Sequence, residues 1–327
     1  MGKILVTGGA GYVGSHVVNI LGKAGHSLIV IDNLSSGKKE SILYGKFIHA
    51  DLSHDKKIDE ILACEDVDAC LHFAGSIVVP ESFERPLDYY QNNTFNSHKL
   101  IASCSRHGVK AFIFSSTAAV YGHNENGQCS ENAPLAPTSP YGRSKLATEW
   151  ILEDAARVGH LKHVSLRYFN VSGASVDGRL GQNSPQATHL LKVACETAIG
   201  KRKGMDIFGT DYPTYDGTCI RDYIHVDDLA KAHLDALTYL LDGGQSATFN
   251  CGYGHGHSVK EVVSTVKKVS GEDFPVRESR RRPGDPPKLI AIPQKIKSEL
   301  DWKPQYDDLE FIIKTAYEWE KNLLSSN

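Results

Sequence analysis

The chain has 327 residues, a length that suggests about two domains or one large α/β domain. Its apolar fraction of 41% and charged fraction of 23% are ordinary for a globular protein, and no apolar run reaches the roughly 18 residues of a membrane-spanning helix. The formal net charge of −3 provides no basic surface for nucleic acid or anionic membranes. We therefore expect neither nucleic acid nor a membrane as a partner.

The cysteine and histidine patterns argue against disulfides and metal sites. Seven cysteines, an odd number without a C-x-x-C pair, favour reduced and mostly buried thiols in a cytosolic protein. The fifteen histidines include no H-x-x-x-H or H-E-x-x-H pattern. The opening residues GKILVTGGAG already predict a strand entering a turn, so we expect no signal peptide. A cytoplasmic protein without a metal site is predicted.

The first half of the chain alternates short apolar runs with amphipathic segments. Continuous Val, Ile, Leu and Phe runs suit strands that are buried on both faces. The predicted strands are 3–8, 27–33, 46–52, 69–75, 111–117 and 164–170, and the first helix is predicted over 14–25. Strand–helix alternation implies a parallel sheet with right-handed crossovers. We therefore predict a doubly wound, Rossmann-type α/β domain over residues 1–173.

The second half of the chain has a different composition. Segments rich in Gly, Asp, Pro or Arg predict loops at 174–185, 209–222 and 277–288. Helices are predicted at 186–200, 227–241, 258–270 and 307–324. These features indicate a second, smaller α/β substrate domain over 174–327, with some segments returning to the first domain. It is expected at the carboxyl edge of the sheet, where ligands bind in open α/β folds.

A glycine-rich turn follows the first predicted strand. In VTGGAGYVGSH, Gly8 permits a tight turn, Gly11 lets the backbone approach a pyrophosphate, and Gly14 lets helix and strand pack closely. The helix N-terminus then offers free N–H groups to phosphate. Asp32 ends the next strand, where its carboxylate can accept from ribose hydroxyls and repel a 2′-phosphate, so NAD is favoured over NADP. Asp51 ends another strand and either meets the adenine or caps the strand end.

Polar side chains end the strand predicted at 111–117. The string FIFSSTAAVYG places Ser115, Ser116 and Thr117 at the strand's tip, which is the ligand edge of such a sheet. About two dozen residues later, SPYGRSK contains Tyr141 and Lys145, which share one face of a helix because they are four residues apart. Together these residues predict a dehydrogenase-like site.

Tyr141 is the expected acid–base group. An isolated tyrosine titrates near 10, and a neighbouring ammonium together with a nicotinamide charge favours the phenolate and lowers its pKa. Lys145 can also hold the cofactor ribose, and Thr117 can relay the proton between substrate and phenolate. The alternative is a packing tyrosine beside a solvated lysine. The glycine loop and the polar strand tip favour the catalytic interpretation.

These three features, in this order, resemble the extended short-chain dehydrogenase/reductase family. Further strings narrow the resemblance to the UDP-galactose 4-epimerase family within it, and it extends over nearly the whole chain. The strings are HFAGSIVVPESFERPLDYYQNN, FIFSSTAAVYG, SPYGRSK, LRYFNVSGA, IFGTDYPTYDGTCIRDYIHVDDLA and RRPGD. The block DYPTYDGTCIRDYIHV is the most specific of them.

The resemblance implies a set of functional residues. Catalysis would fall to Tyr141, Lys145 and Thr117. NAD would be held by Gly8, Gly11, Tyr12, Val13, Gly14, Asp32, Asn33, Asp51, Leu52, Phe73, Ala74, Gly75, Asn92, Ser115, Tyr141, Lys145 and Tyr168. A UDP-hexose would meet Thr117, Tyr141, Asn170, Phe208, Arg221, Arg282, Asp285 and Leu289. Phe208 would lie near the uracil, and the two arginines would clamp the diphosphate because the guanidinium fork donates two hydrogen bonds.

Two positions vary within the family. Some members have lysine where this chain has Ile77, so one contact to the cofactor phosphate is expected to be missing here. Leu289 aligns with the position that limits the sugar pocket, where tyrosine restricts members to plain hexoses and smaller residues admit a 2-acetamido group. Leucine is intermediate. Some activity on UDP-N-acetylhexosamines is therefore expected.

The implied reaction interconverts UDP-galactose and UDP-glucose by oxidation at C4, rotation of the 4-keto sugar and re-reduction. A nucleotide-sugar 4,6-dehydratase is disfavoured because Ala118 and Ala119 stand where it needs an Asp-Glu pair. UDP-glucuronate decarboxylase and a non-catalytic dinucleotide-sensing regulator remain as alternatives. The family is commonly dimeric, and the candidate homodimer contacts are residues 93–106 and 145–157.

Overall fold

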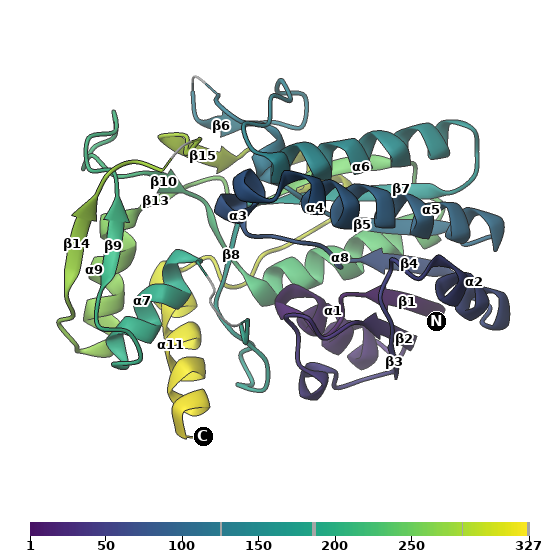
Figure 1. Ribbon diagram of the computed structural model, residues 1–327, viewed down its shortest axis with the longest axis horizontal. Helices are drawn as coiled ribbons and strands as arrows, with labels where there is room; N and C mark the ends of the chain where they lie inside the picture. Colours follow the sequence, from purple (N-terminus) through teal and green to yellow (C-terminus); the bar gives the residue numbers. More distant parts are fainter. Residues whose placement is uncertain (125, 185–187, 283, 326–327) are drawn as a thin grey trace.

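A parallel sheet of seven strands forms the centre of the computed structural model, which describes residues 1–124, 126–184, 188–282 and 284–325 (Figure 1). The strand order is β12-β7-β5-β4-β1-β2-β3. The strands are β1 (Lys3–Thr7), β2 (Ser27–Asp32), β3 (Lys46–His49), β4 (Ala69–His72), β5 (Ala111–Thr117), β7 (Lys162–Tyr168) and β12 (Ala247–Cys251). The order reverses between β1 and β4, which opens a crevice at the carboxyl ends of these strands. The predicted doubly wound fold is confirmed.

Helices cover both faces of this sheet (Figure 1). One face carries α1 (Tyr12–Lys23) and α8 (Val226–Leu241), and the other carries α2 (Asp55–Cys64), α5 (Asn96–Arg106) and α6 (Pro140–Arg157). Successive side chains of β1 alternate between the two layers: Ile4 and Val6 join the core under α1, while Leu5 joins the core under α2. All three are fully buried, which explains why the strand sequence is continuously apolar.

The segment between β4 and α5 forms short helices. These are α3 (Val79–Glu84), α4 (Pro86–Tyr90) and a π-helical turn (Gln91–Phe95) that runs directly into α5. A single turn η3 (Ala118–Val120) follows β5. A further 3-10 turn, η1 (Lys39–Ser41), lies between β2 and β3. Both α3 and α4 pack against α6, so the segment after β4 is fixed to the helix that carries Tyr141 and Lys145.

The remaining strands form smaller sheets beside the main one (Figure 1). One sheet has the order β13-β10-β15-β6, and two pairs are β11 with β8 and β14 with β9. Their bounds are β6 (Gln128–Cys129), β8 (Asn170–Ser172), β9 (Met205–Phe208), β10 (Ile220–Arg221), β11 (Tyr223–His225), β13 (His257–Ser258), β14 (Val276–Ser279) and β15 (Lys288–Ala291). The helices of this part are α7 (Leu190–Ala198), α9 (Val259–Ser270), α10 (Gln294–Glu299) and α11 (Leu309–Ser325).

Two loop predictions are wrong in part. The predicted loop 209–222 contains β10, and the predicted loop 277–288 contains most of β14 and the start of β15. These strands are only two to four residues long and pair with distant segments, so local composition does not reveal them. Within the described residues, the helix predicted from 186 begins at Leu190, and positions 186–187 lie outside the described residues.

Two elements from the second half of the chain belong to the main sheet. Strand β12 pairs in parallel with β7 from Ala247–Val164 to Cys251–Tyr168. Helix α8 packs on α1, β5 and β7. The chain therefore crosses more than once between the part built around the main sheet and the part that contains the smaller sheets. Among the described residues, no helix is both long and apolar enough to span a bilayer.

Candidate active site

The glycine-rich turn is a close-packed junction between β1, β4 and α1. Gly8 has a φ of +73°, and a Cβ on it would lie 2.5 Å from the backbone nitrogen of Ala74. A Cβ on Gly14 would lie 2.2 Å from the carbonyl oxygen of Gly8. Gly11 caps the N-terminus of α1 with extended backbone. These features match a loop that brings backbone N–H groups close to a pyrophosphate.

We expect Gly14→Ala to lower the free energy of unfolding by about 3 kcal/mol, because no side-chain rotation relieves a clash with backbone atoms. Gly11→Ala is the matched control, since its Cβ would meet only the Gly8 carbonyl oxygen, at 3.2 Å. Urea denaturation of the cofactor-free variants measures the difference. Equal stability of the two variants would contradict the packing role of Gly14.

Asp32 lies at the end of β2 with its carboxylate turned to the glycine turn. Its Oδ2 accepts a hydrogen bond from Ala10 N (2.9 Å), and its Oδ1 accepts one from Leu34 N (2.8 Å). Each carboxylate oxygen has a second lone pair that can accept from a ribose hydroxyl. The side chain is therefore fixed beside the loop before any cofactor binds.

Asp51 and Asn33 meet at the neighbouring strand ends. Asn33 Nδ2 donates to Asp51 Oδ2 (2.6 Å), and Asp51 Oδ1 accepts from Ser53 N (2.8 Å). Hydrogen bonds, led by the one from the Ser53 side chain, lower the pKa of Asp51, although partial burial opposes them. Asp51 thus caps a turn, and next to it Leu52 is buried. The additional contact of Asp51 with adenine stays a prediction.

The other predicted cofactor residues surround the same crevice. Tyr12 donates its hydroxyl to the Gly173 carbonyl oxygen (2.6 Å), and Val13 packs on the core beside it. The Phe73 ring lies 4.8 Å from that of His233, and the backbone nitrogen of the next residue, Ala74, donates to Thr7 O (3.2 Å). The structure therefore brings these residues together at the carboxyl edges of β1 and β4.

Gly75 and Asn92 complete that edge. A Cβ on Gly75 would lie 2.9 Å from Asn93 Oδ1 and 3.4 Å from Lys145 Nζ, so the backbone passes directly beside the lysine. Asn92 donates to Ser76 Oγ (2.9 Å). Sequence reasoning missed Asn93, whose buried amide bonds Ser76 N at 2.7 Å and Ser76 O at 3.0 Å. These bonds fix the segment after β4 against the π-helical turn.

Helix α6 presents Tyr141 and Lys145 to the tip of β5. The helix starts where the Ser139 side chain accepts from Gly142 N (3.1 Å), with Pro140 in the first turn. Tyr141 is 9% exposed and Lys145 is 2% exposed. The alternative of a solvated lysine is therefore wrong.

Lys145 reaches past the helix to the strand. Its Nζ donates to the Ser115 carbonyl oxygen (3.0 Å) and lies 4.9 Å from the centre of the Phe114 ring. Burial lowers the pKa of Lys145 from 10.5 to about 8, and the charge of Glu149 opposes the shift. Part of the lysine population is therefore neutral in mildly alkaline solution.

Tyr141 lies within hydrogen-bonding reach of Thr117, as a proton relay requires. Burial raises the pKa of Tyr141 above 10.0, and the hydrogen bond with Thr117 offsets only part of the effect. The predicted lowering is therefore wrong for the protein without its cofactor, because burial disfavours the phenolate. The contribution of a nicotinamide charge to the pKa of Tyr141 stays a prediction.

Tyr168 ends β7 beside these residues. Its hydroxyl hydrogen-bonds the Ser115 hydroxyl, and burial raises its pKa. The predicted cofactor residues of β5 and β7 are thus joined directly at the sheet edge.

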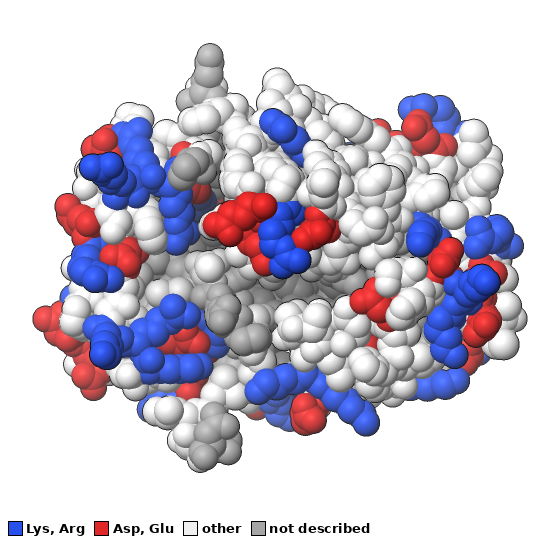
Figure 2. Space-filling view, in the orientation of Figure 1, with Lys and Arg blue, Asp and Glu red and all other residues white. Residues whose placement is uncertain are grey.

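Besides Thr117 and Tyr141, the predicted substrate residues lie on the small sheets and in the loop between β14 and β15. Arg221 on β10 stands in register with Leu289 on β15, and its Nη2 lies 3.5 Å from Asp285 Oδ1. The guanidinium of Arg282 lies 3.8 Å from the centre of the Phe208 ring. This face of the molecule is hollowed between the two parts, with charged side chains on the border (Figure 2).

Leu289 and Asn170 connect these sheets to the catalytic edge. Leu289 packs against the apolar cluster formed by Ala118, Val120 and Tyr121, which directly follow Thr117. Asn170 on β8 pairs with Tyr223 and follows the end of β7. The structure therefore brings the substrate set and the acid–base set to one region.

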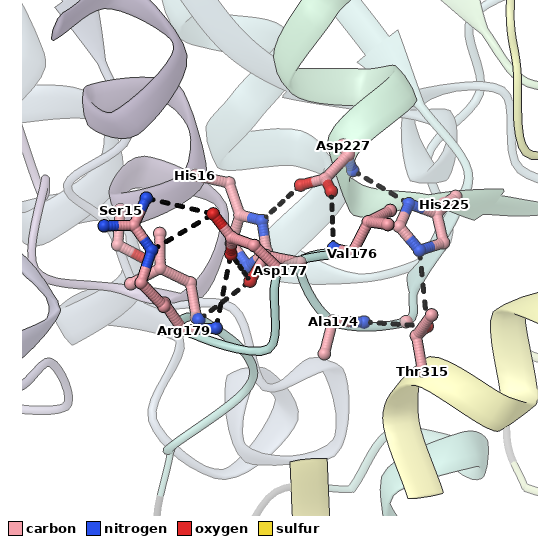
Figure 3. Close-up of polar contacts among 12 residues, drawn as sticks. Ser15, His16, Ala174, Val176, Asp177, Arg179, His225, Asp227 and Thr315 are labelled. Atoms are coloured by element: carbon pink, nitrogen blue, oxygen red, sulfur yellow. Dashed lines mark hydrogen bonds and ion pairs between the residues drawn. The ribbon is translucent and has the colours of Figure 1, made fainter. Parts of the chain in front are cut away.

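A polar network that sequence reasoning missed joins α1 to the second part (Figure 3). His16 Nδ1 and Asp227 Oδ1 are 2.7 Å apart, and Asp227 Oδ2 accepts from Val176 N (3.1 Å). At the start of α8, His225 Nε2 lies 3.3 Å from Thr315 Oγ1 on α11. The string DYIHVDD, which carries His225 and Asp227, was the available signal. The network holds α1, the helix that follows the glycine turn, against the loop after β8.

The glycine turn, the carboxylate at the end of β2 and the Tyr-Lys pair at the tip of β5 are the features that assign this chain to a class of proteins. The sequence profile described as "NAD dependent epimerase/dehydratase family" matches residues 4–252, and the chain belongs to this family. The names of individual relatives are more specific than the family description. A UDP-glucose 4-epimerase of Azospirillum brasilense is 52% identical over 99% of this chain and 93% of its own.

Solved structures of similar proteins agree with these sequence comparisons. The UDP-Glc/GlcNAc 4-epimerase from Campylobacter jejuni is 52% identical, with a TM-score of 0.86 over 98% of this chain and all of its own. The UDP-glucose 4-epimerase from Brucella ovis, solved in complex with NAD, is 40% identical, with a TM-score of 0.94 over 97% of this chain and 98% of its own. The predicted resemblance is confirmed.

Proposed function

We propose that this protein is an NAD-dependent UDP-glucose 4-epimerase that interconverts UDP-galactose and UDP-glucose. The observation that carries the proposal is the meeting of Thr117, Tyr141 and Lys145 at the edge that holds the glycine turn. The residues fit NAD, because Gly8 and Gly14 leave no room for a Cβ and Asp32 is fixed beside the turn. Conversion of UDP-galactose to UDP-glucose by the purified protein is the direct test.

NAD, when bound beside the glycine turn and Lys145, would supply hydride transfer to and from C4. Tyr141, as phenolate, takes the proton of the C4 hydroxyl either directly or through Thr117. Lys145 stabilises the phenolate and holds the cofactor ribose. After the 4-keto sugar has turned its other face to the site, Tyr141 returns the proton and C4 is inverted.

The nucleotide end of the substrate stays fixed while the hexose turns. Arg221 and Arg282 hold the diphosphate through guanidinium hydrogen bonds, and Phe208 contacts the uracil. Asp285 orients Arg221, whose side chain is only 11% exposed. The apolar side chain of Leu289 borders the sugar without binding its hydroxyls, which suits a group that must rotate.

The alternatives are not favoured. UDP-glucuronate decarboxylase and a non-catalytic regulator both conflict with the relatives, which are named as UDP-glucose 4-epimerases. The complete acid–base set of Thr117, Tyr141 and Lys145 also argues against a protein that only senses dinucleotide.

We expect turnover of UDP-N-acetylglucosamine, and we expect Leu289→Tyr to abolish it while plain hexose turnover falls less than about tenfold. A tyrosine is larger than Leu289 and would narrow the proposed sugar pocket, and the Campylobacter jejuni relative is named for both sugars. Separate assays with UDP-galactose and UDP-N-acetylgalactosamine measure the ratio. Wild-type protein inactive on the acetylated sugar at high enzyme concentration would end this proposal.

A homodimer is proposed through residues 93–106 and 145–157. Large apolar side chains are exposed on adjoining elements there: Leu87 on α4 at 79%, Phe95 in the π-helical turn at 59% and Trp150 on α6 at 55%. Both α4 and the π-helical turn pack against α6, so these side chains belong to one surface. Sedimentation velocity that shows only a monomer at micromolar concentration would contradict this proposal.

We also propose a cytoplasmic location. All seven cysteines are free thiols in the structure, as expected of a protein kept under reducing conditions. Fractionation of the source cells tests it.

A further inference from the structure

A buried ion pair lies directly behind the proposed catalytic residues. Glu149 on α6 is 1% exposed and Arg167 on β7 is 3% exposed. Arg167 Nε donates to Glu149 Oε1 (3.0 Å) and Oε2 (3.2 Å), and Arg167 Nη2 also donates to Oε2. The proposed proton transfers use neither residue.

The pair completes a set of hydrogen bonds between α6 and the tip of β5. Three consecutive residues of β5 interact with α6. Lys145 Nζ donates to the Ser115 carbonyl oxygen, the Ser116 hydroxyl donates to Glu149 Oε1, and Thr117 interacts with Tyr141. The bond from Ser116 to Glu149 thus lies between the contacts of the lysine and the tyrosine.

Arg167 extends this contact to the next strand. It stands opposite Ser116 in the parallel pairing of β5 and β7, and it immediately precedes Tyr168. Its Nη1 donates to the Tyr121 hydroxyl (3.1 Å), and Tyr121 donates to Asn250 Oδ1 on β12 (2.7 Å). The ion pair therefore ties α6 to β5, β7 and β12 at the edge where the site is built.

A role in stability alone does not account for such a pair. Removing two charges from water costs energy that an apolar pair of similar size does not incur, so a buried pair is weak evidence for added stability. Its hydrogen bonds have fixed directions, and they hold α6 at one position along β5. A small shift along that contact would separate Tyr141 from Thr117, and misplacement by about 1 Å can cost about 100-fold in rate.

Glu149 also contributes charge. It is one helical turn after Lys145 on α6, and its charge favours the ammonium form of the lysine. Two other titratable groups face this region: His72 on β4 interacts with the Lys145 charge, and Tyr168 on β7 hydrogen-bonds Ser115, whose carbonyl oxygen accepts from Lys145. Burial lowers the pKa of His72 to about 3, so it stays neutral, and Arg167 is already paired with Glu149.

We propose that Glu149, through Ser116 and Arg167, is a positioning residue that holds Tyr141 and Lys145 in register with Thr117. This inference rests on the proposed acid–base function of those three residues. It assigns a carboxylate that touches neither substrate nor cofactor to the control of the reaction.

The test is Glu149→Gln, which keeps the shape and removes the charge. We expect kcat for UDP-galactose to fall by about 10- to 100-fold with KM nearly unchanged, because the nucleotide clamp is untouched. The alkaline limb of the kcat profile should move down by about one pH unit, since the ammonium of Lys145 loses a nearby negative charge. The matched control is Glu320→Gln, which removes a buried carboxylate that pairs with Lys192 between α7 and α11.

A double variant separates positioning from stability. Glu149→Met with Arg167→Met removes both charges and leaves no unpaired ion, so it decides the question if Glu149→Gln does not fold. We expect this variant to fold and to remain slow with a displaced pH profile. A double variant or a Glu149→Gln variant with wild-type kcat and wild-type pH profile overturns the inference. Wild-type protein without any turnover would instead refute the proposed function on which the inference depends.

Discussion

Tyr141→Phe is expected to lower kcat on UDP-galactose by about 100- to 10,000-fold, the usual contribution of general acid–base catalysis. The substitution removes one hydroxyl from a side chain that is 9% exposed and interacts with Thr117. The ring still fills its place against Tyr89, whose centroid is 6.5 Å away at 90°. Stability and cofactor content should therefore stay close to those of the wild type.

The measurement is the initial rate of UDP-glucose formation, with circular dichroism and bound NAD determined on the same preparation. Tyr239→Phe is the matched control, since it removes the hydroxyl that accepts from Gln245 N (3.1 Å) at the far end of α8. Turnover of Tyr141→Phe within a few-fold of that control would refute the assignment of Tyr141 as the acid–base group.

Lys145→Ala is expected to weaken NAD retention and to raise the pH optimum. The ammonium attracts the phenolate, so its loss raises the pKa of Tyr141 further and moves the acid limb of the rate profile to higher pH. In the wild type, the pKa of Lys145 lies at about 8, so the lysine loses its charge above that pH and kcat/KM should fall. The variant should lack this alkaline limb.

Rate profiles from pH 6 to 10 and the NAD content after gel filtration measure both effects. Lys295→Ala is the matched control, because Lys295 also donates to a strand carbonyl, Thr248 O (3.0 Å), and lies 5.0 Å from a phenylalanine ring centre, that of Phe249. An unchanged pH profile in Lys145→Ala would contradict the tuning role of the lysine.

The central sheet was predictable because its strands carry a strong local signal. The predicted strands β1 (KILVT) and β2 (SLIVID) centre on continuous runs of buried apolar residues, as burial on both faces requires. Strand β12 (ATFNC) carries polar residues, and its pairing with β7 depends on a partner some 80 residues away. Short strands such as β10 and β14 have their pairing determined by distant segments in the same way.

The residues of the candidate site likewise divide into those that belong to a local motif and those whose contacts depend on distant segments. Gly8, Gly14 and Asp32 belong to a compact motif, and Tyr141 with Lys145 to another, so sequence reasoning found them. The bonds of Glu149 to Ser116 and Arg167 join residues 18 to 33 positions apart, and no motif marks them. The raised pKa of Tyr141 in the cofactor-free protein was missed because burial is a property of the fold.

The most direct test of the central claim is incubation of the purified protein with UDP-galactose, without added NAD, while NMR follows the sugar anomeric signals. The signals of UDP-glucose should appear and reach a constant ratio with those of UDP-galactose. That result would establish inversion at C4 and show that the cofactor accompanies the protein. Unchanged UDP-galactose, both without and with added NAD, would contradict the proposed epimerase function.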